Sequence, residues 1–376
     1  MTEVAEAEAL VLAHMPRWSA TSVPLAEAAG RVLATDVDAE RDQPPFDRVT
    51  MDGIAIDHAA WASGQRDFTV QAMQAAGAPA ARLEAATNCI RIMTGAILPT
   101  ACNAVVPVER LIIDADRASI DGDAIVEAGQ FIHRQGSDRR RGDRVLAAGM
   151  RIGPAESAVL ASAGRAEVPV ASLARVGVAS TGDELVAVDA SALAPYQIRS
   201  SNDYGIAASL ESARLATVSR RMLGDDPERI LAAVTRLHDE HDALILSGGV
   251  SMGEFDYVPA VLKALGSTLI FHRINQKPGR PMWFGISGTG KPIFALPGNP
   301  VSTLLCMTRY VLPAFRHAAG LPAFRLELAR LDAAVASPPR MSYFVPVVLR
   351  SAADGLLLAE PRPTNTSALL NFHFCE

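Results

Sequence analysis

The chain has 376 residues, more than the 100 to 200 or so that one hydrophobic core usually holds, so two to four domains are expected. Its formal net charge is −6 and it has no long basic cluster, which disfavours nucleic acid as a partner. The scattered cysteines form no C-x-x-C pair, and no apolar run of about 18 residues lacks a charge or a breaker. These features predict a soluble, cytoplasmic protein with no membrane span.

The first half of the chain carries helical and then β-like signals. An acidic amphipathic start predicts a helix and no export signal. "PLAEAAGRVLATDV" predicts a second short helix that Gly30 would end, and "SAVLASAG" predicts another that ends in glycine. Between them, short β-like runs alternate with turn residues. We predict a helical and linking domain at residues 1–45 and 138–172, and a β-rich lobe at 46–137.

Residues 175–320 change character. The strand-like runs are "RVGVAS", "ATVSRRML", "DALILS", "STLIFHRI" and "PIFAL", and helical segments alternate with them. Apolar strands that alternate with helices indicate a parallel sheet covered on both faces. We therefore predict an α/β multidomain protein with a central parallel-sheet domain at 173–320. The chain alternates again beyond Pro322, which predicts a small C-terminal β lobe at 321–376.

Three unusual turns follow predicted strands. "VASTGDELV" supplies Thr181, Gly182, Asp183 and Glu184; "SGGVSMGEFD" supplies Ser247, Gly248, Gly249, Gly253, Glu254 and Asp256; and "ALPGNPVSTLL" supplies Pro297, Gly298, Asn299 and Pro300. Ligands of an open α/β sheet bind at the carboxyl ends of its strands. Glycines let a ligand approach the backbone, and helix N-termini favour phosphate-like anions. Singly, each turn also has a structural explanation: Asp256 could cap a helix, and Pro300 could begin one.

The carboxylates at these turns indicate a metal. Glu184, Glu254 and Asp256 would repel an anionic ligand unless a divalent cation lay between them, and oxygen ligands suit Mg²⁺. Asp225 in "GDDPER" is a further candidate for this set. Asp226 precedes Pro227 and is expected to cap a helix, which leaves Asp225 as the freer group.

Basic side chains follow in "FHRINQKPGRPMW", where Arg273, Lys277 and Arg280 frame a proline-glycine turn. A solvated surface is an equally weighted explanation for them. Cys306 lies among apolar residues and is expected to be a small buried hydrophobe. The residues alone therefore predict a metal-assisted site for a phosphorylated or nucleotide ligand, and they name no reaction.

Several stretches together resemble the molybdopterin molybdenumtransferase family, which includes the E domain of gephyrin. They include "PPFDRVTMDGIAI", "RIMTGAILPTACNAVVPVE", "VASTGDELV", "QIRSSNDYGIAASL", "SGGVSMGEFDYVPAVL", "QKPGRPMWFG" and "LPGNPVSTLLCMTRYVLP". They occur in the family's order over roughly residues 20–320. The co-occurrence of M-D-G, S-T-G-D-E, S-G-G-V-S-x-G-E-x-D and L-P-G-N-P makes the resemblance specific.

The resemblance implies an elongated homodimer with four domains per chain and a central molybdopterin-binding domain similar to the pterin adenylyltransferases. The implied reaction inserts molybdate into adenylated molybdopterin and releases AMP with the help of Mg²⁺. The implied protein partners are the molybdopterin adenylyltransferase and molybdoenzyme apoproteins. Two alternatives stay open: a non-catalytic scaffold with the same fold, and an adenylyltransferase-like activity confined to the central domain.

The resemblance also assigns residues. Its acidic catalytic set falls on Asp52, Glu184, Asp225 and Asp256, and the last three are expected to hold Mg²⁺. Thr94, Lys277, Pro297 and Pro300 fall on further functional positions. Asp52 is far along the chain from the sheet domain, so the dimer analogy predicts a cleft shared between two subunits.

The chain also departs from the family pattern. Ile54 stands where the family usually has tyrosine, Arg273 and Arg280 replace common lysines, and the chain stops early at "NFHFCE". Because a guanidinium is not equivalent to an ammonium, the two arginines keep the charge and change the geometry.

Overall fold

The computed structural model describes residues 1–250, 256–324, 327–336 and 340–362. Within it the chain forms two compact units. The first contains Met1–Thr35, Ala148–Ala158 and Ala166–Glu376, and the second contains Asp36–Ala147 and Val159–Arg165. No helix in the described ranges is long and apolar enough to cross a membrane. The finer division into four domains stays a prediction.

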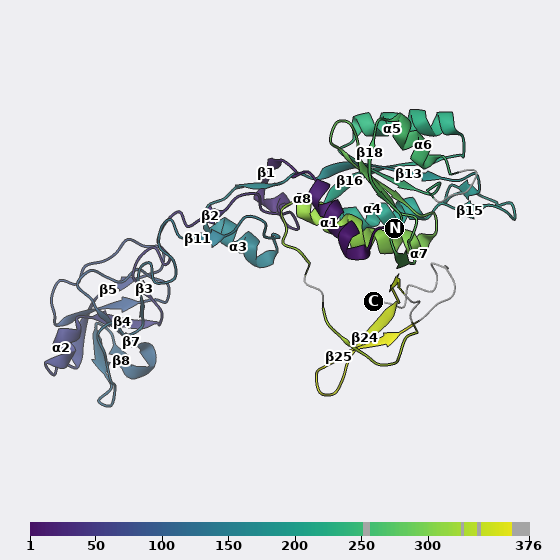
Figure 1. Ribbon diagram of the computed structural model, residues 1–376. Coiled ribbons are helices and arrows are strands. Elements are labelled where there is room, and N and C mark those ends of the chain that lie inside the picture. Colours follow the sequence, from purple (N-terminus) through teal and green to yellow (C-terminus); the bar gives the residue numbers. More distant parts are fainter. Residues whose placement is uncertain (251–255, 325–326, 337–339, 363–376) are drawn as a thin grey trace. The chain divides into compact units, whose positions relative to one another are not determined.

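A six-stranded sheet lies at the centre of the first unit (Figure 1). Its order is β16 (Ala216–Leu223), β13 (Ala174–Thr181), β17 (Ala243–Ser247), β21 (Pro292–Leu296), β20 (Trp283–Ile286) and β18 (Thr268–His272). The first four strands are parallel, whereas β20 and β18 are antiparallel to their neighbours. The predicted α/β fold is confirmed, and the sheet is mixed where the sequence predicted only parallel strands.

Helices cover both faces of this sheet, as Figure 1 shows. On one face lie α1 (Val4–His14), α4 (Asn202–Ser212), α7 (Pro300–Cys306), the π-helix η3 (Met307–Val311) and α8 (Leu312–Ala318); on the other lie α5 (Pro227–Glu240) and α6 (Val258–Ala264). Along β17, Ile245 is buried against the first set, and Leu244 and Leu246 against the second. Successive strand residues point to opposite faces, so a strand buried on both faces must be apolar throughout.

The helix starts test two local predictions. The Asp226 carboxylate accepts hydrogen bonds of 3.0 Å from the N–H groups of Glu228 and Arg229, which confirms it as the cap of α5. Asn299 caps α7, and Pro300 occupies the first helical position as expected. Tyr257 stands at the N-cap position of α6, so Asp256 is not its cap.

The second helix predicted near the start is wrong. After α1 the chain forms β1 (Ala20–Pro24), which pairs antiparallel with β12 (Glu167–Ala171), and then a single 3-10 turn, η1 (Leu25–Glu27). The residues after the turn form bridges, Val32 with Arg151 and Leu33 with Val170. The N–H and C=O groups of these residues bond to distant parts of the chain, so they are not available for the hydrogen bonds within a helix. The predicted helix in "SAVLASAG" is present as part of α3 (Pro154–Ser162).

The second unit is β-rich, as predicted. Its six-stranded sheet has the order β7 (Ala104–Pro107), β4 (Gly53–Ile56), β6 (Asn88–Ile92), β5 (Asp67–Gln74), β9 (Arg117–Ile120) and β8 (Leu111–Asp114). Smaller elements are β2 (Val37–Asp38) with β11 (Arg144–Leu146), β3 (Arg48–Val49) with β10 (Ile132–His133), α2 (His58–Ala62) and η2 (Val108–Arg110).

The C-terminal part of the first unit also forms strands. β22 (Arg330–Leu331), β25 (Leu357–Pro361) and β24 (Val347–Ser351) make a three-stranded sheet. β23 (Ser342–Tyr343) pairs in parallel with β19 (Gln276–Lys277) of the central region. The early end of the chain at "NFHFCE" lies outside the described residues.

Candidate functional site

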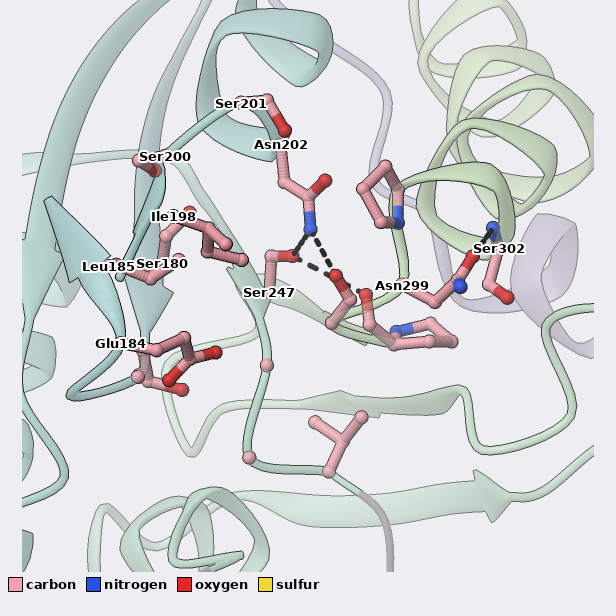
Figure 2. A pocket seen from close by; sticks show the side chains of 18 of the residues that line it. Ser180, Glu184, Leu185, Ile198, Ser200, Ser201, Asn202, Ser247, Asn299 and Ser302 are labelled. Atoms are coloured by element: carbon pink, nitrogen blue, oxygen red, sulfur yellow. Dashed lines mark hydrogen bonds between the residues drawn. The ribbon is translucent and has the colours of Figure 1, made fainter. Parts of the chain in front are cut away.

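A cavity of about 460 Å³ opens at the carboxyl ends of β13, β17 and β21 (Figure 2). Twelve of the predicted site residues line it: Thr181, Gly182, Glu184, Asp225, Ser247, Gly248, Gly249, Asp256, Pro297, Gly298, Asn299 and Pro300. Gly253 and Glu254 lie outside the described residues. The three unusual turns therefore meet at one edge of the sheet, where ligands of α/β domains bind.

The paired glycines allow two of these turns to touch. Gly248 has a φ of +97°, and a Cβ atom there would lie 2.5 Å from the carbonyl oxygen of Thr181. At Gly249, with φ +62°, a Cβ would lie 3.1 Å from the Thr181 hydroxyl oxygen. Side chains at both positions would be strained and crowded. The contact between the β13 and β17 turns is thus one physical reason for glycine at these two positions.

Asn202, the first residue of α4, joins the same loops and was not predicted as a site residue. Its side-chain nitrogen donates hydrogen bonds of 2.8 Å to the Ser247 hydroxyl and 2.8 Å to the Gly298 carbonyl oxygen, as Figure 2 shows. The polar run "SSND" before a helix was the available sequence signal. Other residues that line the cavity were also not predicted. Two short paired strands, β14 (Leu185–Val186) and β15 (Ile198–Arg199), contribute some of them. The full set is Ser180, Leu185, Ile198, Arg199, Ser200, Ser201, Val250, Pro281 and Ser302.

Two buried hydroxyls stand beside the cavity without a partner. Ser180 is 2% exposed and Thr181 is 5% exposed, and neither hydroxyl oxygen has a hydrogen-bond partner within the part of the chain that the structure describes. A buried polar group without a partner is costly, and such groups in native structures often mark a ligand or water position. Both residues line the cavity, but the hydroxyl oxygens themselves are covered.

Carboxylates gather at the acidic side of the cavity. Burial raises the pKa of Asp225, a hydrogen bond from the Asp183 N–H opposes this, and nearby negative charges raise it again, namely those of Asp183, Glu184 and Asp256. This repulsion is what a divalent cation would relieve. No three His, Cys, Asp or Glu side chains of the described ranges are already arranged to hold a metal ion.

The predicted basic residues do not line this cavity. Arg273, Lys277 and Arg280 belong to the loop that leads to Pro281, which does line it. The Arg280 guanidinium donates to the Met1 sulfur, with its Nε 3.1 Å away. The Lys277 ammonium lies 5.8 Å from the centre of the Tyr343 ring.

Asp52 and Thr94 lie in the β-rich unit and are neighbours there. One Asp52 carboxylate oxygen accepts hydrogen bonds from the Thr94 N–H, at 2.6 Å, and from the Thr94 hydroxyl, at 2.7 Å. These bonds, the hydroxyl bond first, lower the pKa of Asp52 and keep it ionised. The predicted cleft that would bring Asp52 to the sheet of a second subunit stays a prediction.

A mixed α/β domain with an acidic cavity at the carboxyl ends of its strands is typical of domains that bind a nucleotide or cofactor. Residues 2–164 match the family described as MoeA N-terminal region (domain I and II), and residues 177–317 match the probable molybdopterin binding domain. The chain belongs to the molybdopterin molybdenumtransferase family and is an enzyme of molybdenum cofactor biosynthesis.

Particular relatives support this assignment. The molybdopterin molybdenumtransferase of Synechocystis is 37% identical over 98% of this chain and 92% of its own length. The molybdopterin molybdenumtransferase 2 of Mycobacterium tuberculosis is 36% identical over 86% of this chain and 81% of its own length. A crystal structure of the molybdopterin biosynthesis MoeA protein of Pyrococcus horikoshii superposes with a TM-score of 0.84 at 27% identity, covering 100% of this chain and 93% of that one.

Proposed function

We propose that the protein inserts molybdate into adenylated molybdopterin and releases AMP, with Mg²⁺ as its cofactor. The observation that carries the proposal is the meeting of three glycine-containing turns and several carboxylates around one cavity. The α4 N-terminus beside Asn202, which lines the cavity, suits the phosphate of a phosphorylated pterin.

The donor set fits Mg²⁺. Mg²⁺ commonly binds one or two carboxylates and fills its other positions with water and substrate phosphates, so a complete protein cage is not needed. Glu184, Asp225 and Asp256 are the residues that would hold it. When bound, the ion would neutralise charge on the pyrophosphate group.

In the proposed reaction, the two thiols of the pterin bind molybdate, and one molybdate oxygen leaves as water with their protons. A water oxygen attacks the adenylyl phosphorus, the bond from that phosphorus to the bridging oxygen breaks, and molybdopterin phosphate departs while AMP keeps the attacking oxygen. If a molybdate oxygen attacks instead, water must then hydrolyse the adenylyl-molybdate to release AMP. The carboxylates orient the attacking oxygen and accept its proton, and the basic residues Arg273, Lys277 and Arg280 balance the charge of molybdate and phosphate. We further propose a cytoplasmic homodimer in which Asp52 of one subunit completes the site of the other. The adenylyltransferase and molybdoenzyme apoproteins are its proposed protein partners.

The test is AMP release from adenylated molybdopterin and Mg²⁺, with and without molybdate. Release that depends on molybdate supports the proposal. Asp256→Asn should abolish release and leave pterin binding largely intact, whereas lost binding with unchanged turnover at saturation contradicts the catalytic assignment. Bound substrate with no release by the wild-type protein would favour a scaffold instead.

Asp225 and Asp226 offer a matched pair for the metal assignment. Both carboxylates are adjacent in sequence, but Asp226 caps α5 and Asp225 lines the cavity. Asp225→Asn should remove most of the Mg²⁺-dependent rate, and Asp226→Asn should retain it. Equal losses in the two variants contradict the role given to Asp225.

A further inference from the structure

Buried side chains hydrogen-bond to the backbone of the basic turn, defined as residues 273–281. The Gln276 side-chain nitrogen donates a 3.1 Å hydrogen bond to the carbonyl oxygen of Pro278, and the Cys306 thiol donates to the Gly279 carbonyl oxygen at 3.7 Å. The same Gln276 nitrogen lies 3.8 Å from the Cys306 sulfur. Two consecutive backbone carbonyls of the turn thus bind one buried polar group.

Tyr310 completes this group. It lies in the π-helix, and its hydroxyl donates a hydrogen bond to the side-chain oxygen of Gln276. Tyr310 is 1% exposed and Gln276 is fully buried, so neither can replace a lost partner with water. Burial raises the pKa of Tyr310, and it raises that of Cys306 to about 12, so both keep the protons that they donate at neutral pH.

The turn is also fitted to this group by shape. Gly279 has a φ of +83°, and a Cβ atom there would lie 2.7 Å from the Gln276 side-chain nitrogen and 2.9 Å from the Cys306 sulfur. The space that a side chain would need at Gly279 is therefore already filled by the group that binds the turn. Any larger residue would push the turn away from it.

The C-terminal part of the unit also holds the turn. The Phe344 N–H donates a 2.9 Å hydrogen bond to the Lys277 carbonyl oxygen, next to the pairing of β19 with β23. Tyr343 of β23 presents its ring to the Lys277 ammonium. Two separate sets of contacts thus fix the backbone around Lys277, although Lys277 itself is exposed.

We propose that Tyr310, Gln276 and Cys306 are positioning residues that set the direction in which Lys277 and Arg280 meet the oxyanion. Lys277 and Arg280 are exposed, whereas Tyr310, Gln276 and Cys306 are buried. The three buried side chains hydrogen-bond to the turn and to one another, so they act through the turn and not on the substrate. This inference rests on the proposed function, because it takes molybdate as the anion that the basic turn binds. A turn released from the buried group would keep its charges and lose their orientation.

The first experiment compares Tyr310→Phe with Phe315→Leu. Both residues belong to the same buried core, but Phe315 makes no hydrogen bond to the turn. Tyr310→Phe should raise the KM for molybdate about tenfold and change kcat about twofold or less. Phe315→Leu, with a comparable loss of Tm, should leave the KM for molybdate unchanged. Equal KM values for the two variants would overturn the proposal.

A second comparison uses two variants of Cys306, so it does not depend on whether the Tyr310→Phe protein folds. Cys306→Ser keeps a donor for Gly279 and should bind like wild type, whereas Cys306→Val removes it and should weaken molybdate binding. The double variant Tyr310→Phe/Gln276→Leu should bind molybdate about as well as the more impaired of the two single variants, because both substitutions break the same hydrogen-bond network. Additive effects contradict a shared network.

Direct titration of molybdate into the full chain separates this inference from the proposed function. If the wild-type protein releases no AMP but binds molybdate in a way that Lys277→Ala abolishes, the proposed reaction fails and the binding comparisons still test the positioning group. Absent molybdate binding, or binding that Lys277→Ala leaves unchanged, overturns the inference itself.

Discussion

One carboxylate oxygen of Asp52 accepts both hydrogen bonds that Thr94 can donate, from its backbone N–H and from its hydroxyl. The two residues are far apart in sequence, and each was predicted separately as a site residue. The pairing lowers the pKa of Asp52 and leaves its second carboxylate oxygen outside these two bonds. Thr94 therefore orients the Asp52 carboxylate and favours its ionised form.

Thr94→Val should raise the pKa of Asp52 toward the ordinary value of about 3.9, because the hydroxyl bond is lost. A lowered folded-state pKa stabilises the fold above the unfolded value, and this stability is lost as the pH falls through the folded value. The variant should therefore be less stable at neutral pH, and its stability should change less as the pH falls into the acid range. Carboxyl NMR titration measures the shift; Thr94→Ser keeps the hydroxyl and should leave it unchanged.

Asp225→Asn should stabilise the protein at neutral pH while it impairs the proposed reaction. Because the folded-state pKa of Asp225 is raised, its contribution is favourable at low pH and is lost as the pH rises above the unfolded value. Removing the charge should therefore raise Tm at pH 7 and have little effect near pH 3. Mg²⁺ should raise the Tm of the wild type more than that of the variant. A lower Tm for Asp225→Asn at pH 7 contradicts the repulsion inferred here.

Asp226→Ala should cost about 1 kcal/mol of stability, because the first turn of α5 loses both hydrogen bonds of its cap. Chemical denaturation measures the loss. Asp226→Ser restores a capping side chain and should recover most of it. Molybdate-dependent AMP release by Asp226→Ala should match wild type under conditions where the protein is folded.

Asn202→Ala should loosen two loops at once. It removes the donors to Ser247 and Gly298 and should cost about 1 to 3 kcal/mol. Hydrogen exchange should quicken at both loops and not in the core of β17. Ser201→Ala is the matched control, because the Ser201 side chain makes no capping bond and its loss should be within about 0.5 kcal/mol.

Gly248→Ala should be far more damaging than Gly290→Ala. Both glycines have positive φ, +97° and +83°, so both variants carry a backbone cost of about 1 kcal/mol. Only Gly248 would also press its Cβ against the Thr181 carbonyl, which should raise the total loss above about 2 kcal/mol. Similar stabilities for the two variants would show that the turns separate easily.

Features that depend on neighbouring residues, such as helix caps and buried strands, could be predicted from the sequence. Asp226 before Pro227 predicted a cap, and apolar runs such as "ALILS" predicted doubly buried strands, because both depend on neighbours in sequence. The antiparallel edge was missed because β20 was not recognised as a strand. The short link Ser287–Lys291 between β20 and β21 was the signal, since so short a connection requires antiparallel strands.

The sequence by itself determined the family, the alternation of strands and helices, and the sheet edge at which the three turns meet. The tertiary structure alone decided that Asn202 reaches Ser247 and Gly298, 45 and 96 residues away, and that Tyr310 reaches Gln276 across 34. The physical reason is that periodicity, caps and turns are set by adjacent residues. Contacts between distant side chains exist only once the packed sheet and helices bring them within hydrogen-bond distance.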